Sequence, residues 1–229
     1  PGDHLSGLVS GGGEIENQPR HRGPVPPLGV GVEMVEQLRG FAALHRVDFW
    51  LQPGGLDTVR PLAPDPPVLR YELPGLAAGI EFEPTDFVQV NDAVNQAMVA
   101  RALELLAPGP QDRVLDLFCG LGNFSLPLAQ RAARVSGVEG DAGLVARARA
   151  NAHRNGISNA GFQVADLSAA GAAADWAREP HELVLLDPPY EDVDVEDALD
   201  RAAPLVASGG QLVLEHSRRA VSPERAGGL

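Results

Sequence analysis

The chain has 229 residues, of which 44% are hydrophobic, and it carries a formal net charge of −13 without a single lysine. This composition supplies a sizeable core and excludes a chain that is disordered throughout. No apolar run approaches the roughly 20 residues that span a bilayer, and no signal peptide is visible. We therefore expect a cytoplasmic protein that does not contact a membrane.

Charge and cysteine content narrow the classes of function further. An acidic chain is a poor general binder of nucleic acid, because contacts to phosphate require cations. An RNA substrate would therefore need a local arginine patch or another domain. The single cysteine, Cys119, cannot form an internal disulfide or a cysteine-based metal cluster. No metal and no iron–sulfur cluster is expected in this chain.

Composition along the chain predicts three parts. Residues 1–28 are rich in glycine, proline and charge, which is typical of a loop or a disordered remnant. Residues 29–90 predict a small α+β subdomain. It has apolar residues at helical spacing from Val32 to Leu44, an alternating strand at 47–52 and two or three short strands around Pro74-Gly75.

Residues 91–229 predict an α/β domain. A helix over 91–106 has Asn91 or Asp92 as its N-cap, and further helices are expected at 123–132, 141–156, 169–178 and 194–206. The five apolar strands between them cover 113–119, 134–140, 160–167, 182–187 and 210–216. Strands that alternate with helices predict a doubly wound, mostly parallel sheet. Its C-terminal end is expected to be incomplete.

Ligands of such sheets bind beyond the carboxyl ends of the strands. The first strand end reads DLFCGLGNF, with Asp116 in the strand and Gly120 and Gly122 in the turn. Glycines let a backbone approach a ligand closely, although a tight turn without a ligand also explains them. A dinucleotide-binding fingerprint needs a third glycine where Ser125 stands, which argues against a dinucleotide-dependent oxidoreductase.

The next strand ends are acidic. Glu139 can accept hydrogen bonds from both hydroxyls of a ribose, and Asp166 from an adenine amino group. Either acid could instead cap the helix that follows it. The fourth strand ends in Asp187-Pro188-Pro189-Tyr190, where two prolines fix φ and hold the acceptors rigid. A rigid strand exit with an aromatic lid is the alternative.

The order D-x-F-x-G-x-G, Glu, Asp, D-P-P-Y over residues 110–217 resembles the Rossmann-like methyltransferases that use S-adenosylmethionine. Residues 30–187, which include the Phe-x-Gln-Val-Asn segment before the long helix, resemble the bacterial RNA (uracil-C5)-methyltransferases. The branch that modifies 23S ribosomal RNA is the most similar. The resemblance implies a cofactor set, with Gln89 reaching in from the preceding subdomain. Its members are Gln89, Asp116, Phe118, Gly120, Gly122, Asn123, Glu139, Asp166 and Asp187.

Within that set the resemblance gives individual roles. Phe118 and Asn123 flank the methionine and adenosine parts of the cofactor, and Glu139 binds the ribose. Asp166 stands on the adenine side, and Asp187 lies near the reacting centre.

The uracil-C5 reaction also requires a nucleophile. In that family a cysteine thiolate attacks carbon 6 of uracil, and a carboxylate later removes the proton from carbon 5. The family's cysteine follows the fifth strand, where this chain has Glu215, His216 and Ser217. Cys119 lies in the cofactor turn and is a poor substitute. The later base, the RNA-binding barrel and the cluster cysteines have no counterpart in this sequence.

Residues 183–217 resemble a different group, the guanine-N2 methyltransferases of 16S ribosomal RNA. By that resemblance Asp187 and the carbonyl of Pro188 accept hydrogen bonds from an exocyclic amine, and Pro189 keeps the segment rigid. Tyr190 would stack on the flipped-out base. These four residues are the candidate catalytic set.

We expect ribosomal RNA to be the substrate, and three hypotheses remain for the function of this chain. The first is methylation of uracil C5, most similar to that of 23S ribosomal RNA. The second is methylation of an exocyclic amine through Asp187-Pro188-Pro189-Tyr190. The third is a cofactor-binding fragment without catalysis. All three share an S-adenosylmethionine pocket, and the oligomeric state stays open.

Overall fold

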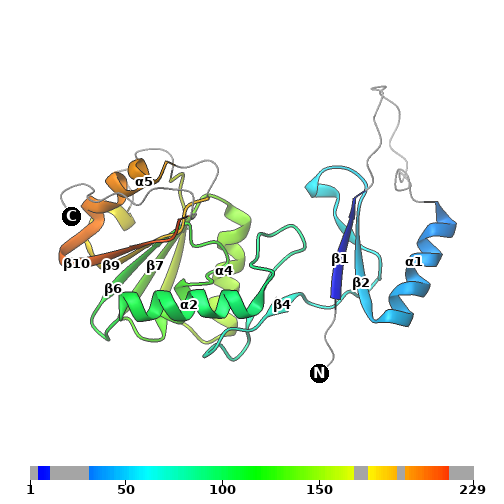
Figure 1. Ribbon diagram of the computed structural model, residues 1–229, viewed down its shortest axis with the longest axis horizontal. Helices are drawn as coiled ribbons and strands as arrows, with labels where there is room; N and C mark the ends of the chain where they lie inside the picture. The colour runs from blue at the N-terminus through cyan, green and yellow to red at the C-terminus, as the bar shows by residue number, and fades with distance from the viewer. Residues whose placement is uncertain (1–4, 11–30, 168–174, 190–193, 217–229) are drawn as a thin grey trace. The chain divides into compact units, whose positions relative to one another are not determined.

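The computed structural model describes residues 5–10, 31–167, 175–189 and 194–216. It divides into two compact units, each visible in Figure 1. The first comprises Pro1–Leu69 with Glu83–Phe87, and the second comprises Arg70–Phe82 with Val88–Leu229. In the described ranges, no helix has the length and apolar content that crossing a membrane requires.

The first unit is a small α/β element. Its sheet has the order β1-β2-β3, in which β2 pairs parallel with β1 and antiparallel with β3. Helix α1 packs beside β2, with the rings of Phe41 and Phe49 6.2 Å apart. The bounds of its elements are β1 (Leu5–Ser10), α1 (Val32–His45), β2 (Val47–Gln52), η1 (Leu56–Thr58) and β3 (Arg60–Pro61).

The predicted helix from Val32 and the predicted strand at 47–52 agree with α1 and β2. Strand β1 differs from expectation, since residues 1–28 were expected to form a loop. Leu5–Ser10 pair in full register with Val47–Gln52, and this distant partner supplies the backbone hydrogen bonds that local composition does not reveal. The rest of 1–28 lies outside the described residues.

The core of the second unit is a five-stranded, fully parallel sheet. Its order is β10-β9-β6-β7-β8, so the predicted doubly wound sheet is confirmed. The chain order reverses between β6 and β9, which is where ligands of open α/β sheets bind. The strands are β6 (Arg113–Leu117), β7 (Arg134–Glu139), β8 (Ala160–Val164), β9 (His181–Leu186) and β10 (Val206–Leu214).

Helices cover both faces of this sheet (Figure 1). Alternate residues of a strand point to opposite faces, so Val114 and Leu185 pack under the first helical layer while Leu115 and Leu186 pack under the second. The first layer contains α2 (Asp92–Leu106), α3 (Ser125–Ala129) and α4 (Ala142–Arg154). The second contains α5 (Val195–Ala202), followed by η3 (Ala203–Leu205).

Side-chain caps define where these helices begin. The Asn91 side chain accepts a hydrogen bond from the backbone N–H of Val94, and that of Asp141 accepts one from Leu144. The first cap agrees with the sequence analysis, and the second stands at the predicted start of the helix over 141–156. Of the helix expected at 169–178, the structure describes only the short turn η2 (Asp175–Ala177) and the residues just after it. Residues 169–174 lie outside the described part.

A short hairpin of β4 (Arg70–Tyr71) and β5 (Ile80–Glu81) belongs to the second unit. The sequence analysis placed it with the small subdomain that ended at residue 90. Asn151 of α4 and Asn155, which directly follows α4, attach it to the second unit instead. Asn151 accepts from the backbone N–H of Glu81 at 2.9 Å and donates to the carbonyls of Glu81 and Leu121. Asn155 makes a matching pair with Ala78 and Gly79.

We predict that Asn151→Ala destabilises the second unit by about 2–3 kcal/mol, because a fully buried amide leaves backbone groups without partners. Urea denaturation followed by circular dichroism measures the change. Gln96→Ala is the control, since the side chain of Gln96 makes only an exposed hydrogen bond to Asp92. Equal midpoints for the Asn151 and Gln96 variants would contradict this role of the asparagine.

Candidate functional site

The carboxyl edge of the sheet brings acids from three adjacent strands onto one face. Asp116 lies in β6, Asp187 directly follows β9, and Glu215 directly follows β10. The ladder continues past the strands, since Asp187 N–H donates to the Leu117 carbonyl at 3.3 Å and Glu215 N–H to the Leu186 carbonyl at 2.9 Å. Alternation then points all three side chains toward the face that α2 and α3 cover.

Asp116 is the most buried of these acids, with an exposed fraction of 0%. The Ser125 hydroxyl of α3 donates to its Oδ2 atom, whereas its Oδ1 atom has no hydrogen-bond partner. The pKa of Asp116 is raised to about 7, chiefly by burial and also by nearby Glu139, while the hydrogen bond from Ser125 opposes this shift. A buried oxygen without a partner requires an explanation, and a ligand at this edge provides one.

The turn after β6 has the backbone conformation of a ligand-binding loop. Phe118, Gly120 and Gly122 all have positive φ, at 65°, 51° and 90°. Residues other than glycine rarely have a positive φ. Phe118 is therefore a backbone outlier of the kind that is frequent at functional sites. A Cβ atom added to Gly120 would meet nothing within 4 Å, so open space adjoins the backbone there.

Glu139 ends β7 beside this turn. Its Oε2 atom accepts from the Gly120 N–H and its Oε1 atom from the Asp141 N–H, both at 3.1 Å. These bonds hold the carboxylate at the sheet edge, and each oxygen keeps a lone pair for a further donor. The Ala165 N–H donates to the Glu139 carbonyl, which places exposed Asp166 at the neighbouring strand end. Glu139 and Asp166 therefore stand at the carboxyl ends of neighbouring strands.

The structure gives Asn123 a role that the resemblance to the uracil-C5 family did not imply. Its amide forms a reciprocal pair with that of Asn95 on α2, and its Oδ1 atom also accepts from the Tyr71 hydroxyl at 3.0 Å. Asn123 thus connects the glycine turn to α2 and to the β4–β5 hairpin. Burial raises the pKa of Tyr71, so this phenol stays protonated and donates.

Sequence reasoning missed Asn95 and Tyr71. The signal for Asn95 was a polar residue on the stripe of α2 that also contains buried Val99 and Ala102. A polar side chain on an apolar stripe needs a buried partner, although the pattern does not say which one.

Of the remaining site residues predicted from the sequence, the structure describes Gln89, Pro188 and Pro189. Gln89 is half-buried in the extended stretch before α2, whose first turns reach this edge because Asn95 contacts Asn123. Pro188 is buried and Pro189 is exposed. Tyr190 lies outside the described residues, so its predicted stacking role stays a prediction.

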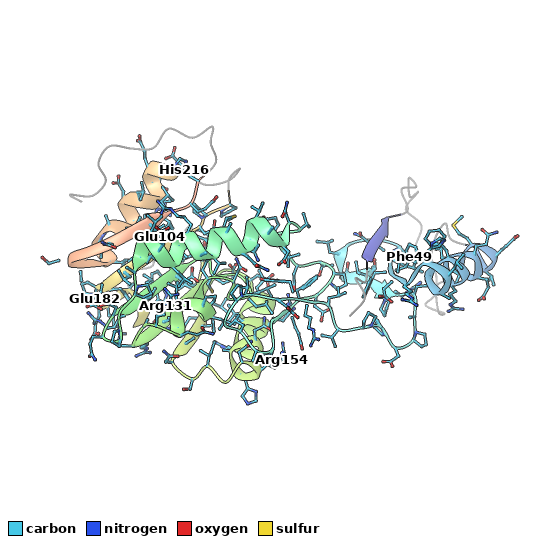
Figure 2. The ribbon with its side chains drawn as sticks, turned by 60° about the horizontal axis from the view of Figure 1, so that its bottom comes forward. Phe49, Glu104, Arg131, Arg154, Glu182 and His216 are labelled. Atoms are coloured by element: carbon cyan, nitrogen blue, oxygen red, sulfur yellow. The ribbon has the colours of Figure 1, made fainter. Side chains whose placement is uncertain are left out.

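The opposite end of the sheet carries a structural ion pair. Figure 2 labels Glu182 near the start of β9 and His216 beyond the end of β10, at different ends of the parallel strands. Arg113 donates to both oxygens of Glu182, at 3.1 Å and 2.7 Å. These hydrogen bonds lower the pKa of Glu182 to about 2. Both side chains are more than a third exposed, so their contribution to stability is at most about 1 kcal/mol.

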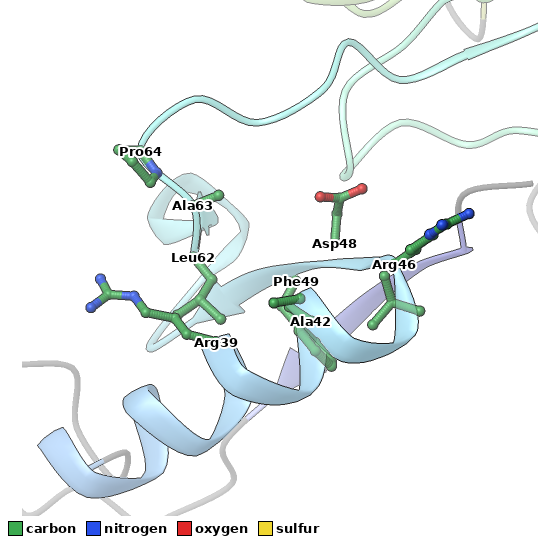
Figure 3. A pocket seen from close by; sticks show the side chains of 10 residues that line it. Arg39, Ala42, Arg46, Asp48, Phe49, Leu62, Ala63 and Pro64 are labelled. Carbon is green, nitrogen blue, oxygen red and sulfur yellow. The ribbon is translucent and has the colours of Figure 1, made fainter. Parts of the chain in front are cut away.

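A separate pocket of about 370 Å³ lies in the first unit (Figure 3). Its walls come from α1, β2 and the segment after β3, and include Arg39, Arg46, Asp48, Phe49 and Leu62. None of the site residues predicted from the sequence lines it. Within the described ranges, no group of three or more histidine, cysteine or acidic side chains is arranged to hold a metal ion.

The fold is that of the Rossmann-like methyltransferases, and solved structures share it. Trm5b from Pyrococcus abyssi is similar with a TM-score of 0.57 at 15% identity, over 79% of this chain and 53% of that one. The putative methyltransferase YhhF from Escherichia coli has a TM-score of 0.53 at 18% identity, over 68% of this chain and 86% of that one. A tRNA (uracil-54, C5)-methyltransferase of Pyrococcus abyssi was solved with S-adenosyl-L-homocysteine. Its TM-score is 0.51 at 21% identity, over 69% of this chain and 38% of that one.

Residues 77–189 match the model of the tRNA (uracil-5-)-methyltransferase family. The 23S rRNA (uracil(1939)-C(5))-methyltransferase RlmD of Xanthomonas euvesicatoria is 54% identical over 149 residues, which is 65% of this chain and 34% of that protein. RlmD of Stenotrophomonas maltophilia is 52% identical over 149 residues, again 65% of this chain and 34% of that protein. The chain thus spans about a third of the length of these relatives.

These comparisons confirm the resemblance to the uracil-C5 family that the sequence analysis stated. The resemblance of residues 183–217 to the guanine-N2 enzymes is not supported by them and stays a prediction.

We predict that Asp116→Asn flattens the dependence of stability on pH. Because the pKa of Asp116 is raised to about 7, the folded chain holds a proton that the unfolded chain has released, and stability falls as pH rises from about 4 to 7. Between pH 5 and 7 this loss amounts to up to about 2 kcal/mol of unfolding free energy, at about 1.4 kcal/mol per pH unit. Asp116→Asn should abolish it. Urea denaturation at both pH values measures it.

The control for this prediction is Asp92→Asn, which changes an exposed aspartate of α2. Its stability should vary with pH as the wild type does. An Asp116→Asn variant that also kept the wild-type dependence would contradict the buried, protonated state of Asp116.

Proposed function

We propose that the second unit binds S-adenosylmethionine at the carboxyl edge of its sheet and belongs to an enzyme that methylates carbon 5 of uracil in ribosomal RNA. The family match over residues 77–189 carries the proposal, since it covers the glycine turn, the acidic strand ends and Asp187 together. The 52–54% identity to the RlmD proteins supports ribosomal RNA as the substrate. A cytoplasmic location follows from that substrate.

The residues at the edge fit the cofactor. Glu139, oriented by two backbone N–H groups, accepts from the ribose hydroxyls, and Asp166 accepts from the adenine amino group. Gly120 lets the backbone approach the cofactor, because open space adjoins it. The unpartnered Oδ1 atom of Asp116 offers an acceptor for a cationic group. Gln89, Phe118, Gly122 and Asn123 complete the wall around these contacts.

S-adenosylmethionine supplies an electrophilic methyl group on a positively charged sulfur. The chain's own task is to orient the acceptor base and to handle the proton that this base releases. We assign both tasks to Asp187, which directly follows β9 and is followed by two prolines that restrict the backbone. Its side chain faces the same side of the sheet as Asp116.

Cys119 is not the nucleophile of this reaction. Its side chain is only 4% exposed and lies against the sheet, close to Gly137. Burial raises the pKa of the thiol, and the negative charges of Asp116 and Glu139 raise it further. A thiolate is the attacking form, so this environment keeps Cys119 unreactive at neutral pH.

Because its net charge is −13, this chain contributes little to the affinity for RNA. Three arginines of the second unit, Arg101, Arg113 and Arg154, are paired with acids on the same unit. Contacts to phosphate therefore fall largely on other parts of the protein.

We predict that an enzyme containing this unit, incubated with bulk ribosomal RNA and methyl-labelled S-adenosylmethionine and followed by digestion to nucleosides, gives label in 5-methyluridine. Cys119→Ala is the matched control and should retain the label, because the buried thiol takes no part. Label in N2-methylguanosine would contradict the proposal and assign Asp187-Pro188-Pro189-Tyr190 to an exocyclic amine. An absence of label alongside cofactor binding would restrict this chain to binding the cofactor.

A further inference from the structure

Two neighbours from different parts of the second unit hold the amide of Asn123. Its Oδ1 atom accepts from the Asn95 amide of α2 at 3.1 Å and from the Tyr71 hydroxyl of β4 at 3.0 Å. Its Nδ2 atom donates to the Oδ1 atom of Asn95 at 2.9 Å. These bonds occupy both lone pairs of the Asn123 oxygen and one of its two N–H groups.

The pairing of the two asparagines does not by itself fix which way their amides point. If both amides turned over, each would again offer one N–H group and one oxygen to the other. The Tyr71 hydroxyl removes this symmetry, because it donates and needs an oxygen opposite it. A turned Asn123 would present an N–H group to the hydroxyl, and the hydroxyl hydrogen would lose its acceptor.

Tyr71 is itself held firmly in the β4–β5 hairpin. Its ring packs against that of Phe82, with the ring centroids 6.1 Å apart. A Cβ atom added to Gly79 would lie 2.6 Å from the Tyr71 carbonyl oxygen, so the two strands approach closely there. The Asn155 side chain donates to the Gly79 carbonyl at 2.8 Å and ties the hairpin to the end of α4. The hydroxyl therefore has a defined place.

We propose that Tyr71 is a positioning residue of the cofactor site, which orients the Asn123 amide so that its second N–H group donates to the methionine carboxylate of S-adenosylmethionine. The inference rests on the proposed function and identifies a donor for the anionic end of that cofactor. Asn123 is half-buried and directly follows Gly122 in the turn after β6. Within the described ranges, its second N–H group donates to no other residue.

A neutral donor suits the charges at this edge of the sheet. The carboxylate of Glu139 and the acid at Asp166 serve the ribose and the adenine in the proposed function, and both would repel a second carboxylate. The anionic end of the cofactor therefore needs N–H or O–H donors elsewhere in the turn. The turned amide would place the Asn123 oxygen against that carboxylate, and two acceptors repel each other.

A double-mutant cycle tests this role, with the affinity for S-adenosylmethionine measured by calorimetry. Tyr71→Phe removes only the hydroxyl and should weaken binding about twofold, because two amide orientations become equally populated and one of them is competent. Asn123→Ala removes the donor and should weaken binding about tenfold. In the double variant, Tyr71→Phe should cause no further loss, since its effect passes through Asn123.

A second ligand and a control variant distinguish this role from a merely structural one. 5′-Methylthioadenosine lacks the methionine carboxylate, so its affinity should be the same in Tyr71→Phe and in the wild type. Phe82→Leu loosens the packing of the same hairpin but keeps the hydroxyl, and it should bind S-adenosylmethionine as the wild type does. Equal losses for both ligands, or additive losses in the double variant, would overturn the proposal.

Proton–nitrogen NMR of the Asn123 side-chain amide without cofactor separates this inference from the proposed function. The amide signals, identified from their loss in Asn123→Ala, should shift in Tyr71→Phe and stay in place in Phe82→Leu. Wild-type protein that binds no S-adenosylmethionine contradicts the proposed function and the carboxylate contact with it. Asn123 signals that do not shift in Tyr71→Phe overturn the orienting role in a protein that does bind. Circular dichroism of each variant shows that the fold is retained.

Discussion

Strand β6 lies between β7 and β9, and the site depends on this parallel pairing. It aligns the residues that follow Leu117, Val138 and Leu186, although these positions are far apart in the sequence. The backbone ladder continues past the strands through the N–H groups of Cys119 and Asp187. The glycine turn, Glu139 and Asp187 therefore meet at one edge of the sheet.

The acids at this edge differ in how they are held and buried. Glu139 is half-exposed and held by two backbone N–H groups, which suits a carboxylate that accepts from hydroxyls. Asp116 and Asp187 lie deeper, and burial raises the pKa of each to about 7. Burial thus favours the protonated form of Asp116 and Asp187, and strongly shifted pKa values of this kind gather at functional sites.

Much of this arrangement could be predicted from the sequence, because the strands are apolar runs bounded by turns and the acids directly follow them. The five strands and the N-caps at Asn91 and Asp141 depend on local patterns of this kind. Strand β1 could not be predicted, because its stability comes from pairing with β2, about 40 residues away.

Contacts that are distant in sequence account for the other differences. The β4–β5 hairpin belongs to the second unit through Asn151 and Asn155, which resemble ordinary helix residues in the sequence. Glu215 looked like the end of a strand, and only the register of β10 with β9 shows that it adjoins Asp187. Tertiary pairing, which has no signature in local composition, decided each of these cases.

Isothermal titration calorimetry with S-adenosylmethionine tests most directly whether this edge binds the cofactor. The account predicts saturable binding to the wild type and a loss of affinity of about tenfold or more in Glu139→Ala, because the acceptor for the ribose hydroxyls is removed. Glu104→Ala, an exposed acid outside the edge, should bind as the wild type does. An affinity unchanged by Glu139→Ala, or wild-type protein without binding, would contradict the account.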